Sequence, residues 1–316
     1  MIRALGLVVL ATALVAPALP VRAVQIRVDA SGGGDYLTIQ AGLDAASTGD
    51  TVRVAPGTYS GAGNRALDFG GTRLTLWAPA GAESTIIDCG LAARAFNFHS
   101  GEDTTAVVRG FTVTRGTATQ GGGLYCAGAS PLVWDCWFVS NSATSGAGAF
   151  CASSSAKFRA CVFRENSATY GSGITILSST AALRNCTFCK NGGAAAQGTI
   201  YCVGSPAPSI YRCVIAFSAT GPGLSCVGGS MPYTTHSIVF ENAGGDDLCG
   251  TAYYNLFEDP LFCGIESDDL TVCANSPCIF SNNGWGEAVG ALGEGCAECS
   301  SPVARTSWGR LKSLYR

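Results

Sequence analysis

The feature that most limits how this chain can fold is a repeat with a period of 25 residues, which drifts by one or two residues in its later units. Each unit opens on a glycine, at Gly121, Gly146, Gly171, Gly198 and Gly221. Paired-helix repeats need about 30 residues or more, so this period is too short for them. The short runs between the glycines are β-branched and aromatic, which indicates strands. The repeat therefore predicts a β-solenoid in which each unit forms one coil of three strands and three turns.

Equivalent residues of successive units should stack in columns, because the coils of a solenoid lie one strand spacing apart, about 4.8 Å. Two columns rich in cysteine and one rich in phenylalanine are predicted to face the core, where cysteine acts as a small apolar residue. An asparagine column is predicted inside a turn, where side-chain amides can bond along the stack. The first cysteine column comprises Cys126, Cys151, Cys202 and Cys226, the second Cys136, Cys161, Cys186 and Cys213, and the asparagine column Asn141, Asn166 and Asn191.

The 16 cysteines fall into two groups. Stacked cysteines have parallel Cβ vectors that hold their Cβ atoms too far apart for a disulfide, so most column cysteines are predicted to be buried free thiols. The disulfide candidates lie in irregular chain, with their pairing open, and are Cys263, Cys273, Cys278 and Cys296. No metal site and no cofactor are expected, because the pairs Cys186-Cys189 and Cys296-Cys299 have no histidine near them.

Four parts are expected along the chain. Residues 1–23 read as a signal peptide, with Arg3 followed by an apolar run that is too short to favour an uncleaved anchor. Residues 24–258 should form the solenoid, with about seven coils, and residues 259–299 a cysteine-rich closing module. Residues 300–316 form a linker and a basic tail, interpreted as a localisation or docking element, with a disordered end and a cap on the last coil as alternatives. No transmembrane span is expected in the mature chain.

The segment DYLTIQAGLDAASTGDTVRVAPGTY, residues 35–59, resembles the N-terminal cap of right-handed parallel β-helix proteins of the pectin-lyase-like superfamily. The repeats resemble those of bacterial right-handed β-helix proteins. Their Gly-Gly-x-Leu and Phe-x-x-Asn motifs are also similar to the repeats of polymorphic outer membrane proteins, which are adhesins. Residues 259–296 look like the closing module of secreted bacterial proteins. This resemblance implies an all-β right-handed parallel β-helix with an N-terminal capping helix, secreted by a bacterium or held at its surface.

A catalytic site on such a solenoid would need carboxylates clustered on adjacent coils. The column Asp135, Ala160, Asn185 and Arg212 and its neighbour Trp134, Arg159, Arg184 and Tyr211 hold no carboxylate pair. The acidic pairs Glu102-Asp103, Asp246-Asp247, Glu258-Asp259 and Asp268-Asp269 are interpreted as solvated turns, and His99 and His236 as ordinary wall residues. The net charge of -3, without a basic helix, gives no support for nucleic-acid binding.

The best candidate surface is the stripe of Trp134, Arg159, Arg184 and Tyr211, with Arg212 beside it. Aromatic faces stack on sugars, and arginine pairs with carboxylates. An ordinary solvated wall is the alternative. The sequence therefore favours a secreted or surface protein without catalytic activity, which binds an extracellular polysaccharide or a cell-surface partner as an adhesin does. The other candidates are a polysaccharide lyase or glycoside hydrolase acting on acidic glycans, and a structural coat component.

Overall fold

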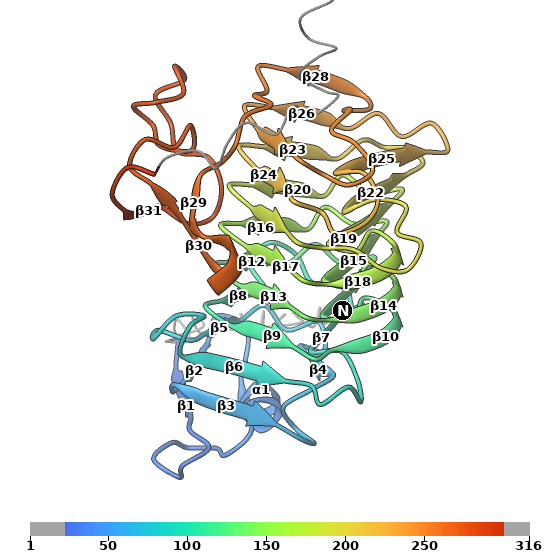
Figure 1. The fold of residues 1–316 in the computed structure, drawn as a ribbon. Helices are drawn as coiled ribbons and strands as arrows, with labels where there is room; N and C mark the ends of the chain where they lie inside the picture. The colour runs from blue at the N-terminus through green and yellow to red at the C-terminus, as the bar shows by residue number, and fades with distance from the viewer. Residues whose placement is uncertain (1–22, 300–316) are drawn as a thin grey trace, which may run out of the picture.

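The computed structural model describes residues 23–299, which wind into a stack of coils with parallel strands (Figure 1). The largest wall, called sheet A here, has ten strands that pair in parallel from the first coil to the last. In order along the sheet they are β1 (Gln25–Val28), β2 (Thr51–Val54), β5 (Thr75–Trp77), β8 (Val107–Arg109), β12 (Leu132–Trp134), β16 (Lys157–Arg159), β20 (Ala182–Arg184), β23 (Ser209–Tyr211), β26 (Tyr233–Thr235) and β28 (Thr251–Tyr253).

Two further walls complete the coils. Sheet B has eight strands, which are β3 (Gly57–Ser60), β6 (Thr85–Asp88), β9 (Thr112–Thr114), β13 (Trp137–Val139), β17 (Val162–Arg164), β21 (Thr187–Cys189), β24 (Val214–Ala216) and β27 (Ile238–Phe240). Sheet C has seven, which are β4 (Leu67–Asp68), β7 (Phe96–Phe98), β11 (Leu124–Ala127), β15 (Ala149–Ala152), β19 (Ile174–Leu177), β22 (Ile200–Val203) and β25 (Leu224–Val227). A small sheet of three strands lies between them in sequence, formed by β10 (Thr117–Gln120), β14 (Ser142–Ser145) and β18 (Ser167–Tyr170).

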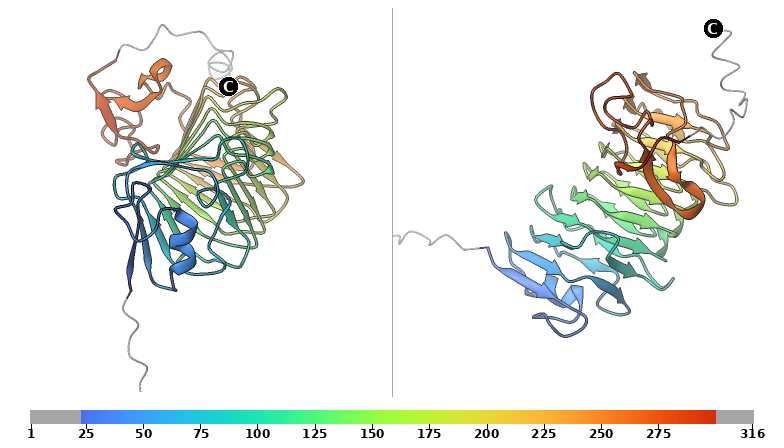
Figure 2. Two further views of the ribbon diagram at one scale, coloured as in Figure 1. Left: turned by 90° about the horizontal axis from the view of Figure 1, so that it is seen from below. Right: turned by 60° about the vertical axis from the view of Figure 1, so that its left-hand side comes forward.

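The expected number of about seven coils is too low, because sheet A alone has ten strands. The coils that the sequence hides are the early ones, in which Thr51 pairs with Thr75 and Thr75 pairs with Val107. Their unequal lengths break the period, although their strands stack as the later ones do. One helix, α1 (Ile39–Ala45), lies at the N-terminal end of the solenoid and buries Ile39 and Leu43 against the first coils (Figure 2). Among residues 23–299, no helix is long and apolar enough to cross a membrane.

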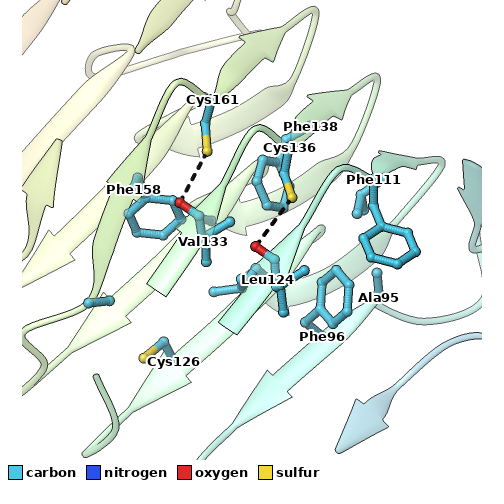
Figure 3. Close-up of a cluster of buried hydrophobic side chains, with 14 of the residues drawn as sticks. Ala95, Phe96, Phe111, Leu124, Cys126, Val133, Cys136, Phe138, Phe158 and Cys161 are labelled. Carbon is cyan, nitrogen blue, oxygen red and sulfur yellow. Dashed lines mark hydrogen bonds between the residues drawn. The ribbon is translucent and has the colours of Figure 1, made fainter. Parts of the chain in front are cut away.

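The predicted core columns are buried. Phe138, Phe163 and Phe188 are fully buried, and their rings stack with centres 5.0 and 4.6 Å apart. The buried thiol of Cys161 donates to the carbonyl of Val133, 3.5 Å away, across the same interior (Figure 3). Narrow coils of this kind hold small and flat side chains, which explains why cysteine and phenylalanine fill the core columns.

The asparagine column forms the buried ladder that the sequence predicts. The Asn166 side chain accepts from Nδ2 of Asn141 at 3.0 Å and donates to Oδ1 of Asn191 at 2.9 Å. Its amide also donates to the carbonyl of Phe138 and accepts from the backbone N–H of Asn141. Because every coil supplies the partner of the next, the ladder satisfies the polar groups of a turn that water does not reach.

Three disulfides join the later cysteines, namely Cys226–Cys249, Cys263–Cys296 and Cys273–Cys299. The interpretation of Cys226 as a free core thiol is wrong, because β25 is the last strand of sheet C and Cys249 takes the place of a next coil. The interpretation of Cys278 as a disulfide residue is also wrong, since its thiol is free and buried. Cys299, which was not among the candidates, is the partner of Cys273.

The remaining ten cysteines are free and buried, including the other members of both columns. Burial raises the pKa of the Cys136 and Cys202 thiols to about 12. We expect the native protein to react with no equivalent of a thiol reagent at pH 8, and the unfolded, unreduced protein to react with ten, in a dithionitrobenzoate titration. A count of six or fewer after unfolding would mean that column cysteines are oxidised, and the stacking would then be wrong.

Residues 259–299 fold back along the outer face of sheet B rather than over the end of the solenoid (Figure 1). This closing module contains β29 (Phe262–Gly264), a 3-10 helix η1 (Ile265–Ser267), β30 (Asp269–Cys273) and β31 (Glu294–Cys296). Its Leu270 packs against Val162 and Cys189. Asp268 pairs with Arg164 at 3.2 Å and with Lys190 at 3.5 Å, so this acid is not the solvated turn that was expected.

The signal peptide expected at residues 1–23 falls, except for its last residue, outside the described residues, and so does the tail expected at residues 300–316.

Glu102 is a second acid, after Asp268, that is not the solvated turn residue expected from the sequence. It is buried, and its carboxylate accepts from the backbone N–H groups of Gly71 and Ser100, each at 3.0 Å. A carboxylate that binds two backbone groups in this way ties neighbouring coils together and is unavailable for chemistry.

Candidate binding face

One outward column of sheet A is made almost wholly of arginine and aromatic residues. Side chains alternate across a strand, so Val133 of β12 points into the core while Leu132 and Trp134 point outward. Parallel register places one residue from each coil in line with Trp134. This basic–aromatic column comprises Arg27, Arg53, Trp77, Arg109, Trp134, Arg159, Arg184, Tyr211, Thr235 and Tyr253.

The structure thus brings together four of the five residues that the sequence singled out, since Trp134, Arg159, Arg184 and Tyr211 occupy consecutive coils. Sequence reasoning missed their neighbours on the earlier coils. Arg109 could have been predicted from the sequence, because it precedes Trp134 by one regular period. Trp77 could not, because the coil that follows it is longer than the rest.

Cationic and aromatic groups of the column touch one another. The guanidinium carbon of Arg109 lies 4.0 Å from the centre of the Trp134 ring and 6.0 Å from that of Trp77. The guanidinium of Arg184 lies 5.3 Å from the centre of the Tyr211 ring. Such contacts hold the long arginine side chains in place while leaving their N–H donors free for a ligand.

Apart from Arg27, which pairs with Asp35 at 3.4 Å, the arginines of the column carry positive charge that no ion pair with a described residue neutralises. Arg53, Arg109, Arg159 and Arg184, and Lys157 on the neighbouring outward column, form no ion pair with a described residue. By contrast, Arg115 on another face pairs with Asp88 at 2.7 Å. The outer face of sheet A is therefore basic although the chain as a whole has a net charge of -3.

Two shallow grooves follow this face from end to end. The first, of about 360 Å³, is lined by Thr51, Thr75, Trp77, Arg109, Leu132 and Trp134. The second, of about 540 Å³, is lined among others by Lys157, Arg159, Arg184, Tyr211, Tyr233 and His236. None of the described residues that line either groove is acidic. The first groove is mainly an aromatic and aliphatic surface, and the second adds three cations on two adjacent coils.

Arg212 does not belong to this face, contrary to the expectation. It lies at the corner between β23 and β24, in the left-handed region with φ of 53°, as Asp135 does at the equivalent corner. This conformation turns the Arg212 side chain toward the closing module, where it pairs with Glu287 and is only 11% exposed. Glu287 also accepts from the hydroxyl of Tyr211 at 3.2 Å, so the module fixes one wall of the second groove.

His236 lies at the same wall, among three aromatic rings. Its ring centre is 5.6 Å from that of Tyr211, 5.3 Å from that of Tyr254 and 5.2 Å from that of Trp285. No carboxylate is among its hydrogen-bond or ion-pair partners in the described part of the chain. The other histidine, His99, is exposed and lies 3.0 Å from Asp68, away from both grooves.

Few carboxyl groups that could act as a general acid or base lie near this face. Asp135 is the nearest acid to Trp134 along the chain, and burial raises the pKa of its carboxyl, against the lowering effect of Arg109. The closing module offers no ready metal site either. The sulfurs of Cys263, Cys273 and Cys296 cluster, but each of these cysteines is already in a disulfide.

Comparison with known proteins gives a family-level match. The family model described as the right-handed β-helix region matches residues 101–284, which is more than half of the chain. Among solved structures, a rhamnogalacturonan lyase is 12% identical with a TM-score of 0.48, covering 69% of this chain and 68% of the other.

Two pectin methylesterases are also similar. The Aspergillus niger enzyme in deglycosylated form is 14% identical with a TM-score of 0.40, covering 76% of this chain and 86% of the other. The carrot enzyme is 12% identical with a TM-score of 0.39, covering 77% and 91%. No curated protein matches this chain.

Proposed function

This chain belongs to the right-handed β-helix family, and from that premise we propose that the outer face of its sheet A binds an anionic polysaccharide without cleaving it. The observation that carries the proposal is the basic–aromatic column, in which Arg53, Arg109, Arg159 and Arg184 have no acidic partner among the described residues and each lies next to an aromatic residue of the column. Aromatic faces suit sugar rings, and arginine suits carboxylates, so the pattern favours a polymer that carries both.

The shape of the site favours a linear polymer over a small molecule. The two grooves are open and lie along nine consecutive strands of sheet A, from β1 to β26. Successive coils repeat the same kind of contact about every 4.8 Å. A chain laid along the solenoid axis would therefore meet a cation or a ring at each step, and weak contacts would add up along its length.

The charge of the second groove favours a uronate-rich ligand. Lys157, Arg159 and Arg184 stand on adjacent coils with no acid beside them. Their long side chains remain accessible, and Arg184 is held by its contact with Tyr211. Carboxylates spaced along a sugar chain would find these cations already in place, so less conformational entropy would be lost on binding.

An extracellular setting agrees with this ligand. The three disulfides are typical of proteins that fold in an oxidising compartment. We take the signal peptide and the bacterial surface location expected from the sequence as part of the proposal. Acidic polysaccharides of capsules, matrices or cell walls occur in that setting.

A polysaccharide lyase or hydrolase is the second candidate, and one observation favours it. The raised pKa of the Asp135 carboxyl, close to Arg109 and Trp134, would suit a general acid. A hydrolase also needs a second carboxylate, and Glu287, which borders the other groove, is paired with Arg212. We therefore favour binding alone.

We expect the double variant Arg159→Ala/Arg184→Ala to bind acidic glycans at least about tenfold more weakly than the wild type. Each charge-assisted hydrogen bond lost is worth roughly 1 kcal/mol at a half-exposed site, and 1.4 kcal/mol is a factor of ten. A glycan array and calorimetry with an oligouronide measure the change. The control is Arg65→Ala/Arg115→Ala, which removes the same charge from other faces. Equal binding by both double variants, or no binding of any acidic glycan by the wild type, would remove the proposal.

A further inference from the structure

A carboxylate of the chain itself lies at the end of the cationic stretch of the second groove. Glu287 of the closing module accepts from the hydroxyl of Tyr211 at 3.2 Å and pairs with Nη2 of Arg212. Tyr211 lines the second groove, and Arg184, one coil earlier, is in register with it. A side-chain carboxylate therefore stands next to the place where the proposed ligand would bring carboxylates of its own.

Arg212 continues the series of cations along the second groove. Its guanidinium carbon lies 4.4 Å from the centre of the Tyr211 ring, and that of Arg184 lies 5.3 Å from the same centre. The two guanidinium groups thus contact one aromatic ring, although they come from adjacent coils. A ligand carboxylate at this point would meet a cation and a phenolic donor, which are the two groups that Glu287 binds.

Glu287 satisfies the guanidinium of Arg212 only in part. The Arg212 side chain is 11% exposed, and its Nε is buried with no hydrogen-bond partner among the described residues. A guanidinium can bind a carboxylate through two parallel N–H bonds, but the Nε donor of Arg212 is left out of its pair with Glu287. The Glu287 side chain is itself 43% exposed, so it can turn out into water at little cost.

The loop that carries Glu287 is held in place by other contacts. Nδ2 of Asn185 donates to the carbonyl of Ala288 at 2.8 Å, and the backbone N–H of Gly290 donates to the carbonyl of Arg212 at 2.9 Å. These bonds join the closing module to the corners of two adjacent coils without using the Glu287 carboxylate. The side chain can therefore leave Arg212 while the module stays where it is.

We propose that Arg212 and the hydroxyl of Tyr211 form a further carboxylate-binding subsite, which Glu287 occupies until a uronate of the ligand displaces it. This inference rests on the proposed function, because it concerns the same acidic polysaccharide. Glu287 then acts as an internal competitor. Because it is tethered at the subsite, it excludes single uronate residues, and a polymer displaces it only when Arg159 and Arg184 already hold that polymer.

Calorimetry with a defined oligouronide tests the subsite. Glu287→Gln keeps the side chain's length and an oxygen for the Tyr211 hydroxyl but removes the charge, so binding is expected to tighten about fivefold. Adding Arg212→Ala to Glu287→Gln should abolish this gain, because the freed cation is then missing. Adding Tyr211→Phe instead, which keeps the ring and removes only the hydroxyl, should abolish part of it. A thermal melt of each variant confirms that it is folded.

Asp268→Asn is the matched control. It removes the same charge from the same module, but Asp268 pairs with Arg164 and Lys190 on sheet B, so binding should change less than about twofold. Equal binding by the wild type and Glu287→Gln, or an equal gain in Asp268→Asn, would overturn the subsite and leave the proposed function standing. No binding of the oligouronide by any of these proteins would refute the proposed function and the subsite with it.

Discussion

Replacing Asn166 by alanine is expected to lower the free energy of unfolding by about 4 kcal/mol. The side chain accepts two hydrogen bonds from Asn141 and donates one each to Phe138 and Asn191, all inside the solenoid. Each lost bond costs roughly 1 kcal/mol, because the partners left behind cannot reach water. Guanidinium denaturation measures the change. Ser167→Ala, at the next, exposed position, is the control and should cost less than about 0.5 kcal/mol. A cost below about 1 kcal/mol for Asn166→Ala would mean that the ladder adds little.

Replacing Phe163 by alanine is expected to cost about 3 to 5 kcal/mol. Its ring stacks between Phe138 and Phe188 at 5.0 and 4.6 Å and meets the edge of Phe158 at 5.9 Å. The coil cannot collapse into the space left behind, because backbone hydrogen bonds to both neighbouring coils fix its height. The matched control is Tyr170→Ala, since Tyr170 contacts the ring of Tyr201 at the surface, tilted by 44° to it, and is 40% exposed. If both variants melted alike, Phe163 would not be part of a packed column.

Regular coils could be predicted from the sequence, because a constant period fixes which residues stack. The 25-residue spacing placed Cys161, Phe163 and Asn166 correctly, and each is buried as expected. The early coils were not visible, because turns of variable length separate Thr75 from Val107 while leaving their strands paired. Periodicity reports on turns as much as on strands, so one longer turn conceals a coil.

Two cysteines were assigned wrongly, because long-range packing decides their state. The column argument assumes that every coil has another above it, and this fails for Cys226 at the end of sheet C. Cys278 was assigned to a disulfide because it lies in irregular chain, but this part of the closing module packs on sheet B and buries Cys278 beside Val214 and Ile238. Both features depend on how distant parts of the chain pack, and no local pattern records that.

The regular spacing of the coils also explains why the sequence predicted only part of the candidate binding face. Trp134, Arg159, Arg184 and Tyr211 share a column because they lie in regular coils. Arg212 follows Tyr211 directly, but its left-handed backbone turns it to Glu287 of the closing module, which the spacing could not reveal. Register can therefore predict which side chains line a wall, while the corners between walls need the tertiary structure.

The most direct test of polysaccharide binding without cleavage is a calorimetric titration with a defined oligouronide. The ligand is then recovered from the calorimeter cell and analysed by mass spectrometry. We expect saturable binding that weakens with salt, since the cations of the face are accessible. The ligand should come back with its length unchanged and with no unsaturated end. No heat of binding would contradict the assignment of the face. Shortened or unsaturated products would show that an enzyme, with Asp135 as a candidate acid, is the better description.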